Sequence, residues 1–331
     1  MEAALAAELP AGEGWQYEPK WDGFRCLAKR DGDDVQLISK SGKPLGRYFP
    51  EMLEVLAGLK HDRFLLDGEL IISVGDVLSF DALQLRLHPA ESRVRKLAAD
   101  SPAELMLFDV LSLAGDDYTD KPLSERRAAL EKFHTSITAP QLKLSPVTPD
   151  RATALAWLER SGGALDGVIA KRVGQPYKSG ERAMVKVKPE RTADCVVGGF
   201  RYTEKQDVVG SLLLGLYDGA GLLNHVGFTS AIPAREREQL TGDLEALIEP
   251  PGFTGSAPGG PSRWSTARSG QWQPLRPELV VEVKYDQVTA GRFRHGTSIV
   301  RWRPDKAPTQ CTVEQLKPEL RPSELKEIFG S

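Results

Sequence analysis

The sequence predicts an α+β protein in two parts, and the arrangement of apolar residues along the chain carries this prediction. Up to about residue 190, segments with helical periodicity alternate with strand-like segments. After that point, short strand-like runs dominate and one helical segment interrupts them. Few short strands with one helix in about 140 residues are typical of a small β-barrel such as an OB-fold. We therefore expect an α+β domain followed by a small barrel.

Two segments of the first part carry clear helix signals. Residues 51–60 place apolar side chains on one helical face, namely Met52, Val55, Leu56 and Leu59. Thr148-Pro149-Asp150 predicts the start of another helix, with Thr148 as the cap, a proline in the first turn and a favourable acid. Ser161-Gly162-Gly163 predicts its end.

The second part is expected to be a succession of strands and turns. The expected elements are, in order, strands over 196–202 and 211–217, a hairpin turn at Asp218-Gly219, a strand over 221–228 and a helix over 234–248. Residues 249–263 are rich in Pro, Gly and Ser, which predicts a long flexible loop rather than packed structure.

Two later strands show alternation. In 279–286, the residues expected to face one way are Val281, Val283 and Tyr285. In 298–303, we expect Val300 and Trp302 on one face and the remaining residues on the other, namely Ile299, Arg301 and Arg303.

Composition excludes several classes of protein. The chain has 331 residues, of which 40% are hydrophobic and 27% charged, as in globular proteins. It contains no run of about 20 apolar residues, and its N-terminus lacks the pattern of a secretion signal. Three separated cysteines exclude a disulfide framework and suit a reducing cytosol, and five scattered histidines show no metal-binding spacing.

Charge is unevenly distributed although the net charge is only -3. Residues 263–306 hold nine Lys/Arg against four acids, with Trp264, Trp272, Phe293 and Trp302 among them. Such a stretch fits a surface for a phosphate backbone. It fits a solvated face of an ordinary β domain equally well, and this feature alone does not separate the two.

The segment Tyr17–Arg25 (YEPKWDGFR) is the most informative one for chemistry. The glycine-rich loops G-x-x-x-x-G-K-[ST] and G-x-G-x-x-G are both absent, so a bound nucleotide would be held by side chains. In an extended strand Glu18, Lys20 and Asp22 share one face, and Gly23 allows a close turn. Lys20 would be a phosphate-binding cation or a nucleophile, unless the segment is a plain surface strand.

Further lysines and acids could complete a phosphate site. In a strand over 184–188, Lys186 and Lys188 lie together, which favours an anion between them, although edge-strand lysines also deter aggregation. The segments containing Asp67-Gly68-Glu69 and Asp166-Gly167 each place acids beside an apolar run. Carboxylates and lysines around one pocket would hold Mg²⁺ and phosphates.

The order of these motifs resembles the covalent nucleotidyltransferase superfamily. K-x-D-G-x-R, D-G-E, F-D, D-G-V-x-x-K, K-x-K and R-x-D-K follow one another from Tyr17 to Lys306. Specifically, the chain resembles compact bacterial ATP-dependent DNA ligases linked to end joining and break repair. The resemblance implies an adenylation (nucleotidyltransferase) domain over 1–190 and an OB-fold domain over 191–331. It also implies ATP and Mg²⁺ as cofactors, with Mn²⁺ as an alternative metal.

The resemblance implies a role for each matching residue. Lys20 would attack the α-phosphate of ATP and become lysyl-AMP. The other implied nucleotide contacts are Glu18 at the adenine, Phe108 stacked on it, Arg25 at the ribose and phosphate, Glu69 at the ribose, Lys186 and Lys188 at the α-phosphate, Arg182 and Lys40 elsewhere on the nucleotide, and Arg303 and Lys306 at the leaving pyrophosphate. Glu69 and Asp166 would be the metal ligands.

Three departures from the family pattern affect these roles. Lys40 stands where the family usually has Arg, so an ammonium group replaces a guanidinium that could make two parallel hydrogen bonds. Met184 replaces a frequent Trp, and Asp166 is one methylene shorter than the frequent Glu.

The resemblance also implies partners and a location. They are nicked double-stranded DNA, DNA-repair proteins that recruit the enzyme, no membrane, and a bacterial cytoplasm with nucleoid association when DNA is bound. Alternatives are an RNA ligase, a GTP-using capping-type enzyme, or a non-catalytic nucleic-acid-binding OB protein.

Overall fold

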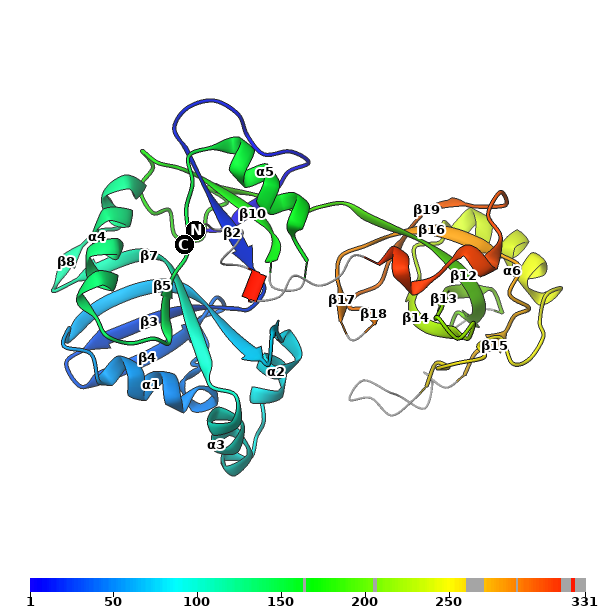
Figure 1. Ribbon diagram of the computed structural model, residues 1–331, viewed down its shortest axis with the longest axis horizontal. Coiled ribbons are helices and arrows are strands. Elements are labelled where there is room, and N and C mark those ends of the chain that lie inside the picture. The colour runs from blue at the N-terminus through cyan, green and yellow to red at the C-terminus, as the bar shows by residue number, and fades with distance from the viewer. Residues whose placement is uncertain (163–164, 205–206, 260–270, 290, 317–322, 325–331) are drawn as a thin grey trace. The chain divides into compact units, whose positions relative to one another are not determined.

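The computed structural model describes residues 1–162, 165–204, 207–259, 271–289, 291–316 and 323–324 (Figure 1). The chain divides into two compact units with the boundary between Pro189 and Glu190. Ser323 and Glu324 belong to the first unit, where the Ser323 backbone N–H donates to Asp76 at 2.9 Å. These two described residues therefore lie outside the second unit, although the expected second domain spans 191–331. No helix of the described residues is long and apolar enough to cross a membrane.

The first unit is a mixed α+β structure with two sheets. A larger sheet has the strand order β4-β3-β5-β7-β8, with β6 on β5 and β9 on β7, and a smaller one has the order β1-β11-β10-β2. The larger sheet consists of β3 (Phe24–Asp31), β4 (Asp34–Ser39), β5 (Arg63–Val74), β6 (Val77–Leu78), β7 (Ala103–Leu113), β8 (Asp116–Asp117) and β9 (Leu142–Leu144). The smaller sheet consists of β1 (Ala3–Leu5), β2 (Trp15–Trp21), β10 (Leu165–Arg172) and β11 (Met184–Val187).

The chain passes from one sheet to the other at Asp22-Gly23. β2 ends at Trp21 in the smaller sheet, and β3 begins at Phe24 in the larger one. A Cβ atom on Gly23 would lie 2.1 Å from the Leu70 carbonyl oxygen of β5, so only glycine fits here. This crossing brings the end of β2 and the start of β3 to the junction of the sheets.

Helices cover the sheets of the first unit. They are η1 (Gly46–Tyr48), α1 (Pro50–Ala57), α2 (Phe80–Arg86), α3 (Glu91–Asp100), α4 (Leu123–Ser136) and α5 (Arg151–Arg160). The helix expected over 51–60 is confirmed as α1, although it ends earlier, at Ala57, with Gly58 as its C-cap. Met52 and Leu56 are fully buried, and Val55 and Leu59 pack against the same core.

The predicted start of α5 was placed two residues too early. Asp150, not Thr148, is the N-cap, because its carboxylate accepts hydrogen bonds from the backbone N–H groups of Ala152 and Thr153 at 3.2 and 2.9 Å. Thr148 instead pairs with Tyr17 through backbone hydrogen bonds of 2.8 and 3.0 Å. The predicted end at Ser161 is confirmed.

The second unit is the expected small barrel. Its main sheet has the order β14-β13-β12-β16-β19, with β15 on β12. The strands are β12 (Arg191–Tyr202), β13 (Val209–Tyr217), β14 (Leu223–Thr229), β15 (Gln273–Pro274), β16 (Val280–Tyr285), β17 (Val288–Thr289), β18 (Arg292–Phe293) and β19 (Ser298–Trp302). The helical segments are η2 (Ala234–Glu236), α6 (Arg237–Glu245), η3 (Pro308–Gln310) and η4 (Val313–Gln315).

The two edges of this sheet meet, which closes the barrel. The Thr229 hydroxyl at the end of β14 donates to the Thr297 carbonyl just before β19 at 2.8 Å. The Thr297 N–H donates to the Phe228 carbonyl at 3.1 Å. The predicted orientation of Val281, Val283 and Tyr285 is confirmed, since all are buried in the barrel core.

Two predictions for the second unit were wrong. Phe253, in the segment expected to be an unpacked loop, is only 4% exposed, because glycines in β12 and β13 leave room for its ring. The alternation expected in 298–303 breaks at Val300, which is 51% exposed, whereas Ile299 and Trp302 both pack against the core. A register shift between β16 and β19 explains this, because it adds one residue to β19.

The contact of Phe253 with Gly198 predicts a stability effect. A Cβ atom at residue 198 would lie 2.6 Å from the ring, and a ring held in the core cannot move aside freely. Gly198→Ala should therefore lower the free energy of unfolding by about 1–3 kcal/mol, measured by denaturant titration. Gly219→Ala, with no atom within 4 Å of the new methyl group, is the matched control. Equal stability of the two variants would contradict the packing described.

Candidate functional site

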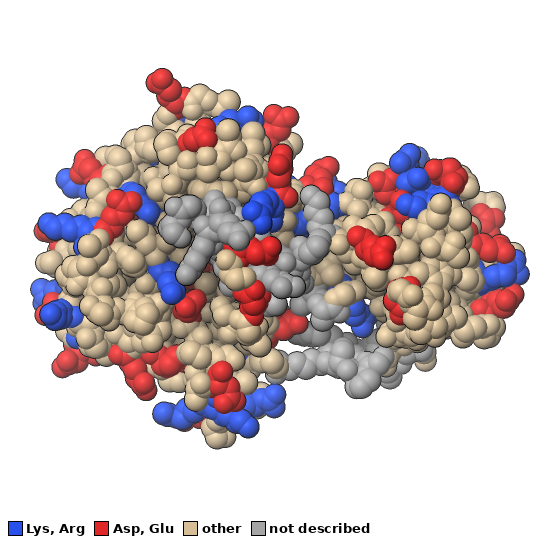
Figure 2. Space-filling view, viewed as in Figure 1, with Lys and Arg blue, Asp and Glu red and all other residues tan. Residues whose placement is uncertain are grey.

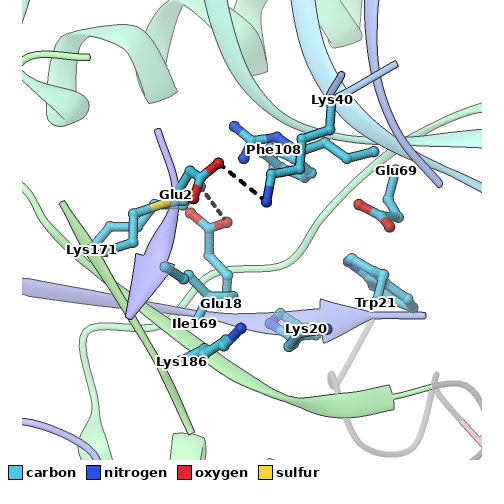
Figure 3. Close-up of a pocket in the computed structure, with 14 residues that line it drawn as sticks. Glu2, Glu18, Lys20, Trp21, Lys40, Glu69, Phe108, Ile169, Lys171 and Lys186 are labelled. Carbon is cyan, nitrogen blue, oxygen red and sulfur yellow. Dashed lines mark ion pairs between the residues drawn. The ribbon is translucent and has the colours of Figure 1, made fainter. Parts of the chain in front are cut away.

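A cavity of about 250 Å³ lies in the first unit where the two sheets meet (Figure 3). It gathers side chains from β2, β3, β5, β7, β10 and β11, together with residues 2–3 and Lys40. The predicted site residues that line it are Glu18, Lys20, Arg25, Lys40, Glu69, Phe108 and Lys186. Asp166 stands beside the cavity through its contact with Lys20, and Lys188 through its contact with Asp166, whereas Arg303 and Lys306 belong to the second unit.

Asp166 connects two of the predicted lysines. Its carboxylate accepts a hydrogen bond from Lys20 and lies 3.0 Å from the Lys188 ammonium. Gly167, with φ of +137°, makes this possible, because a Cβ there would lie 2.2 Å from the Val187 carbonyl oxygen. The close approach of β10 to the end of β11 thus brings all three charged groups together.

Lys186 faces the same cavity. It has no ion pair within the part of the chain that the structure describes. Burial lowers its pKa, and the neighbouring charges of Lys20, Lys188 and Lys40 lower it further. An anion in the cavity would relieve this repulsion, which is the situation of a phosphate-binding lysine.

One end of the cavity combines an aromatic ring with a buried ion pair. The carboxylate of Glu18 lies 2.7 Å from the Lys171 ammonium and accepts a hydrogen bond from Gln16 at 2.8 Å. The Lys171 nitrogen lies 4.7 Å from the centroid of the Phe108 ring. A flat apolar surface beside one acceptor and one donor suits a heteroaromatic base.

Sequence reasoning did not assign Lys171 to the site. The D-G-V-x-x-K motif contains it, but its role depends on which face of β10 it occupies. In the register of β10 with β2, Ile169 lies opposite Glu18, and Lys171 shares that face two residues on. Strand alternation from Ile169 could have found it. Trp21, Glu2 and Met184 also line the cavity without having been predicted to.

Arg25 is held in a fixed orientation. Its Nε and Nη2 donate to the Asp67 carboxylate at 3.1 and 2.7 Å, and the Tyr177 hydroxyl donates to the same carboxylate at 2.9 Å. Asp67 is fully buried, and its charge raises the pKa of Arg25 against the opposing effect of burial. Buried, bidentate pairing of this kind directs the guanidinium into the cavity, where its Cζ lies 5.8 Å from the Phe108 ring.

Lys40 stands at the mouth of the cavity, whereas Arg182 is exposed on the surface and does not line it. Lys40 forms an ion pair of 3.2 Å with Glu2, which Figure 3 shows as a dashed line, and both side chains are well exposed. The carboxylate of Glu2 has a pKa below its usual value, chiefly because of Lys40 and also because of Arg182 and Arg25. An acidic side chain therefore occupies a position of strong positive potential.

Glu69 is the second carboxylate at the site. Within the described residues it makes no hydrogen bond or ion pair, although it lines the cavity. Burial raises its pKa to about 8, and the charges of Lys20 and Arg25 offset only part of this effect. No group of three or more His, Cys, Asp or Glu among the described residues forms a ready metal site. The residues near Lys20 that could serve as metal ligands are Glu69 and Asp166. Two carboxylates suit a divalent cation whose other ligands are phosphate oxygens.

Within the described residues, most basic side chains of the stretch 263–306 pair with acids of the second unit. Arg263 and Arg268 lie outside the described residues. The described members that pair with carboxylates are Arg276, Lys284, Arg301, Arg303 and Lys306. Blue and red side chains are likewise interspersed on the face shown in Figure 2. Use of this stretch as a phosphate-backbone surface stays a prediction.

The raised pKa of Glu69 predicts a pH effect on stability. Between about pH 4.5 and 8 the folded chain keeps a proton that the unfolded chain has released, so stability falls as pH rises through this window. Glu69→Gln should flatten the fall of Tm between pH 5 and 9, measured without nucleotide or divalent metal. The exposed Glu159→Gln on α5 is the control and should keep the wild-type profile. Parallel curves for Glu69→Gln and the wild type would contradict the prediction.

Comparison with known proteins agrees with this geometry. A family model described as ATP dependent DNA ligase domain matches residues 4–188, and one described as ATP dependent DNA ligase C terminal region matches residues 205–306. The chain is 46% identical over 319 residues to DNA ligase C2 of Mycolicibacterium smegmatis, covering 92% of this chain and 90% of that protein. It is 45% identical over 321 residues to DNA ligase C of Mycobacterium tuberculosis, with 92% and 90% covered.

Two further matches are more distant. The chain is 31% identical over 311 residues to the multifunctional non-homologous end joining protein LigD of Mycobacterium bovis, covering 91% of this chain and 37% of that longer protein. A solved Lig E DNA ligase matches with a TM-score of 0.54 at 16% identity, covering 92% of this chain and 99% of that one, which supports the fold. Through its two matched domains and its near full-length relatives, the chain belongs to the ATP-dependent DNA ligases.

Proposed function

We propose that this ATP-dependent DNA ligase works through Lys20. The Nζ atom of Lys20 would form a bond to the α-phosphorus of ATP while the bond to the pyrophosphate oxygen breaks, giving lysyl-AMP. AMP would then pass to a 5′-phosphate at a nick in double-stranded DNA, and a 3′-hydroxyl would displace AMP and join the strands. The placement of Lys20 between an acid and two further lysines at a base-sized cavity carries this proposal.

The neighbours of Lys20 supply what the first step requires. A lysine attacks only as a neutral amine, and the Asp166 carboxylate in contact with the ammonium is placed to accept its proton. Lys186 and Lys188 present positive charge on the same side, where charge develops on the phosphate oxygens. Arg25, fixed by Asp67, would bind the ribose or phosphate.

The end of the cavity lined by Phe108 favours adenine over guanine. Adenine presents an amino group and a neighbouring unprotonated ring nitrogen on its pairing edge. Glu18 would accept from that amino group and Lys171 would donate to the ring nitrogen, with the base stacked on Phe108. Guanine presents a carbonyl and a ring N–H at these positions, which would face the wrong partners.

The carboxylates of Glu69 and Asp166 fit a divalent metal that is shared with the phosphates. Mg²⁺ in nucleotide sites is usually bound by one or two carboxylates and phosphate oxygens, and Mn²⁺ accepts the same donors. When bound, it would neutralise charge on the phosphates. Asp166 would then exchange its contact with Lys188 for the metal and keep its contact with Lys20, and Glu69 would ionise.

The second unit and the partners complete the proposal. Arg303 and Lys306 would bind the leaving pyrophosphate, with Arg182 and Lys40 as further nucleotide contacts. The printed name of the LigD relative refers to end joining, and we infer a role in DNA break repair beside proteins that recruit the ligase. The family matches do not favour an RNA ligase, a capping enzyme or a non-catalytic protein. A cytoplasmic, nucleoid-associated location stays a prediction.

The role of Lys20 is tested by separating the steps. Lys20→Ala should form no covalent adduct with labelled ATP and Mg²⁺ but should still seal a nick that already carries AMP, because that step needs no lysine nucleophile. Lys132→Ala, an exposed lysine on α4, is the matched control and should do both. Normal adduct formation by Lys20→Ala would disprove the assignment.

The role of Arg303 and Lys306 predicts a different pattern. Arg303→Ala with Lys306→Ala should slow self-adenylation by about a hundredfold or more, because the leaving group is no longer held. Sealing of a pre-adenylated nick should be nearly unchanged. Both rates are measured in single-turnover assays. Normal adenylation, or equal loss in both steps, would count against the pyrophosphate role.

A further inference from the structure

Asp194 on β12 forms ion pairs with Arg303 and Lys306, the two cations that we propose bind the pyrophosphate. Its carboxylate accepts from Arg303 Nη1 at 2.9 and 3.1 Å, and from Lys306 Nζ at 2.7 Å. All three side chains are largely shielded from solvent, with exposed fractions of 12% for Asp194, 18% for Arg303 and 25% for Lys306. Shielded, charge-assisted contacts of this kind fix side-chain geometry better than exposed surface pairs do.

The backbone of Asp194 is itself clamped. The Asp194 N–H donates to the Gln315 side-chain oxygen at 2.8 Å, and the Gln315 amide nitrogen donates to the Asp194 carbonyl at 2.9 Å. Asp194 also lies opposite Glu282 in the ladder of β12 and β16. The carboxylate therefore projects from a rigid point in the barrel wall.

The main chain of Arg303 is equally fixed. Its N–H donates to the Val280 carbonyl at 2.8 Å, directly after the end of β19, and the Lys306 N–H donates to the Arg303 carbonyl at 3.2 Å. This turn places both side chains on the side of the sheet that carries Asp194. Asp305 takes the other edge of the guanidinium, accepting from Nε at 2.9 Å and from Nη2 at 2.9 Å.

These contacts leave hydrogen-bond donors available. An ammonium group has three N–H bonds, and Lys306 uses one of them on Asp194. A guanidinium has five, and Nη2 of Arg303, which has two, makes a single contact among the described residues, with Asp305. Both cations can thus remain bound to their carboxylates while they donate to a phosphate oxygen.

We propose that Asp194 is a positioning residue for self-adenylation, which holds Arg303 and Lys306 side by side with free donors ready for the pyrophosphate. This inference rests on the proposed function of these two cations. Two like charges repel, and the carboxylate between them offsets that repulsion and removes their rotational freedom before ATP binds. Asp194 itself touches neither ATP nor DNA in this role.

The test uses the full chain and the variant Asp194→Asn, which keeps the size of the side chain and its backbone contacts. We expect single-turnover self-adenylation at saturating ATP to slow about tenfold, with sealing of a pre-adenylated nick and Tm nearly unchanged. Asp194→Glu, which restores the charge, should recover part of the rate. In the Arg303→Ala, Lys306→Ala background, Asp194→Asn should not slow self-adenylation further, because the two cations that Asp194 positions are already absent.

Glu282→Gln is the matched control, because it removes a carboxylate from the neighbouring strand that pairs with Arg301 at 2.7 Å. It should adenylate at the wild-type rate. Faster adenylation by Asp194→Asn would show that Asp194 competes with pyrophosphate and would overturn the inference, as would an unchanged rate. Equal loss in both steps with a lower Tm would make Asp194 merely structural and also overturn it. Normal adenylation by the Arg303, Lys306 double variant would instead reject the proposed function of these cations.

Discussion

The close approach of Gly23 to β5 is the constraint on which the site depends. The chain leaves the smaller sheet at Trp21 and enters the larger one at Phe24, and only a residue without a side chain fits against the Leu70 carbonyl between them. Lys20 and Arg25 therefore stand on two different sheets within six residues of sequence. The cavity lies where the two sheets meet, and side chains from both of them line it.

Within the cavity, most cations are already neutralised by acids. Asp67 binds Arg25, Glu18 binds Lys171, Asp166 binds Lys20 and Lys188, and Glu2 binds Lys40. The buried pairs hold their cations in fixed directions, whereas the Glu2–Lys40 pair at the mouth is exposed and therefore weak. A nucleotide would meet a site whose geometry is set in advance. Lys186 is the lysine in its wall for which the described residues supply no counter-ion.

The second unit repeats this principle around Asp194. A carboxylate fixed in the barrel wall holds two cations that the sequence places just after β19. In both units, acids fix the directions of the cations that the proposed chemistry uses, as Asp67 does for Arg25 and Asp194 does for Arg303 and Lys306. Preorganisation of this kind is how a side-chain site can bind phosphates without a glycine-rich loop.

The two-part fold and half of the residues that line the cavity could be predicted from the sequence alone. Strand alternation places Glu18 and Lys20 on one face, and this prediction requires only the local sequence. The pairing of Lys20 with Asp166, 146 residues later, and the position of Lys171 beside Phe108 were decided by the register of β10 against β2 and β11. The break of alternation at Val300 and the burial of Phe253 came from a bulge and from glycines in other strands. Local periodicity reports which side of a strand a residue occupies, but only tertiary packing decides which residues from distant segments meet there.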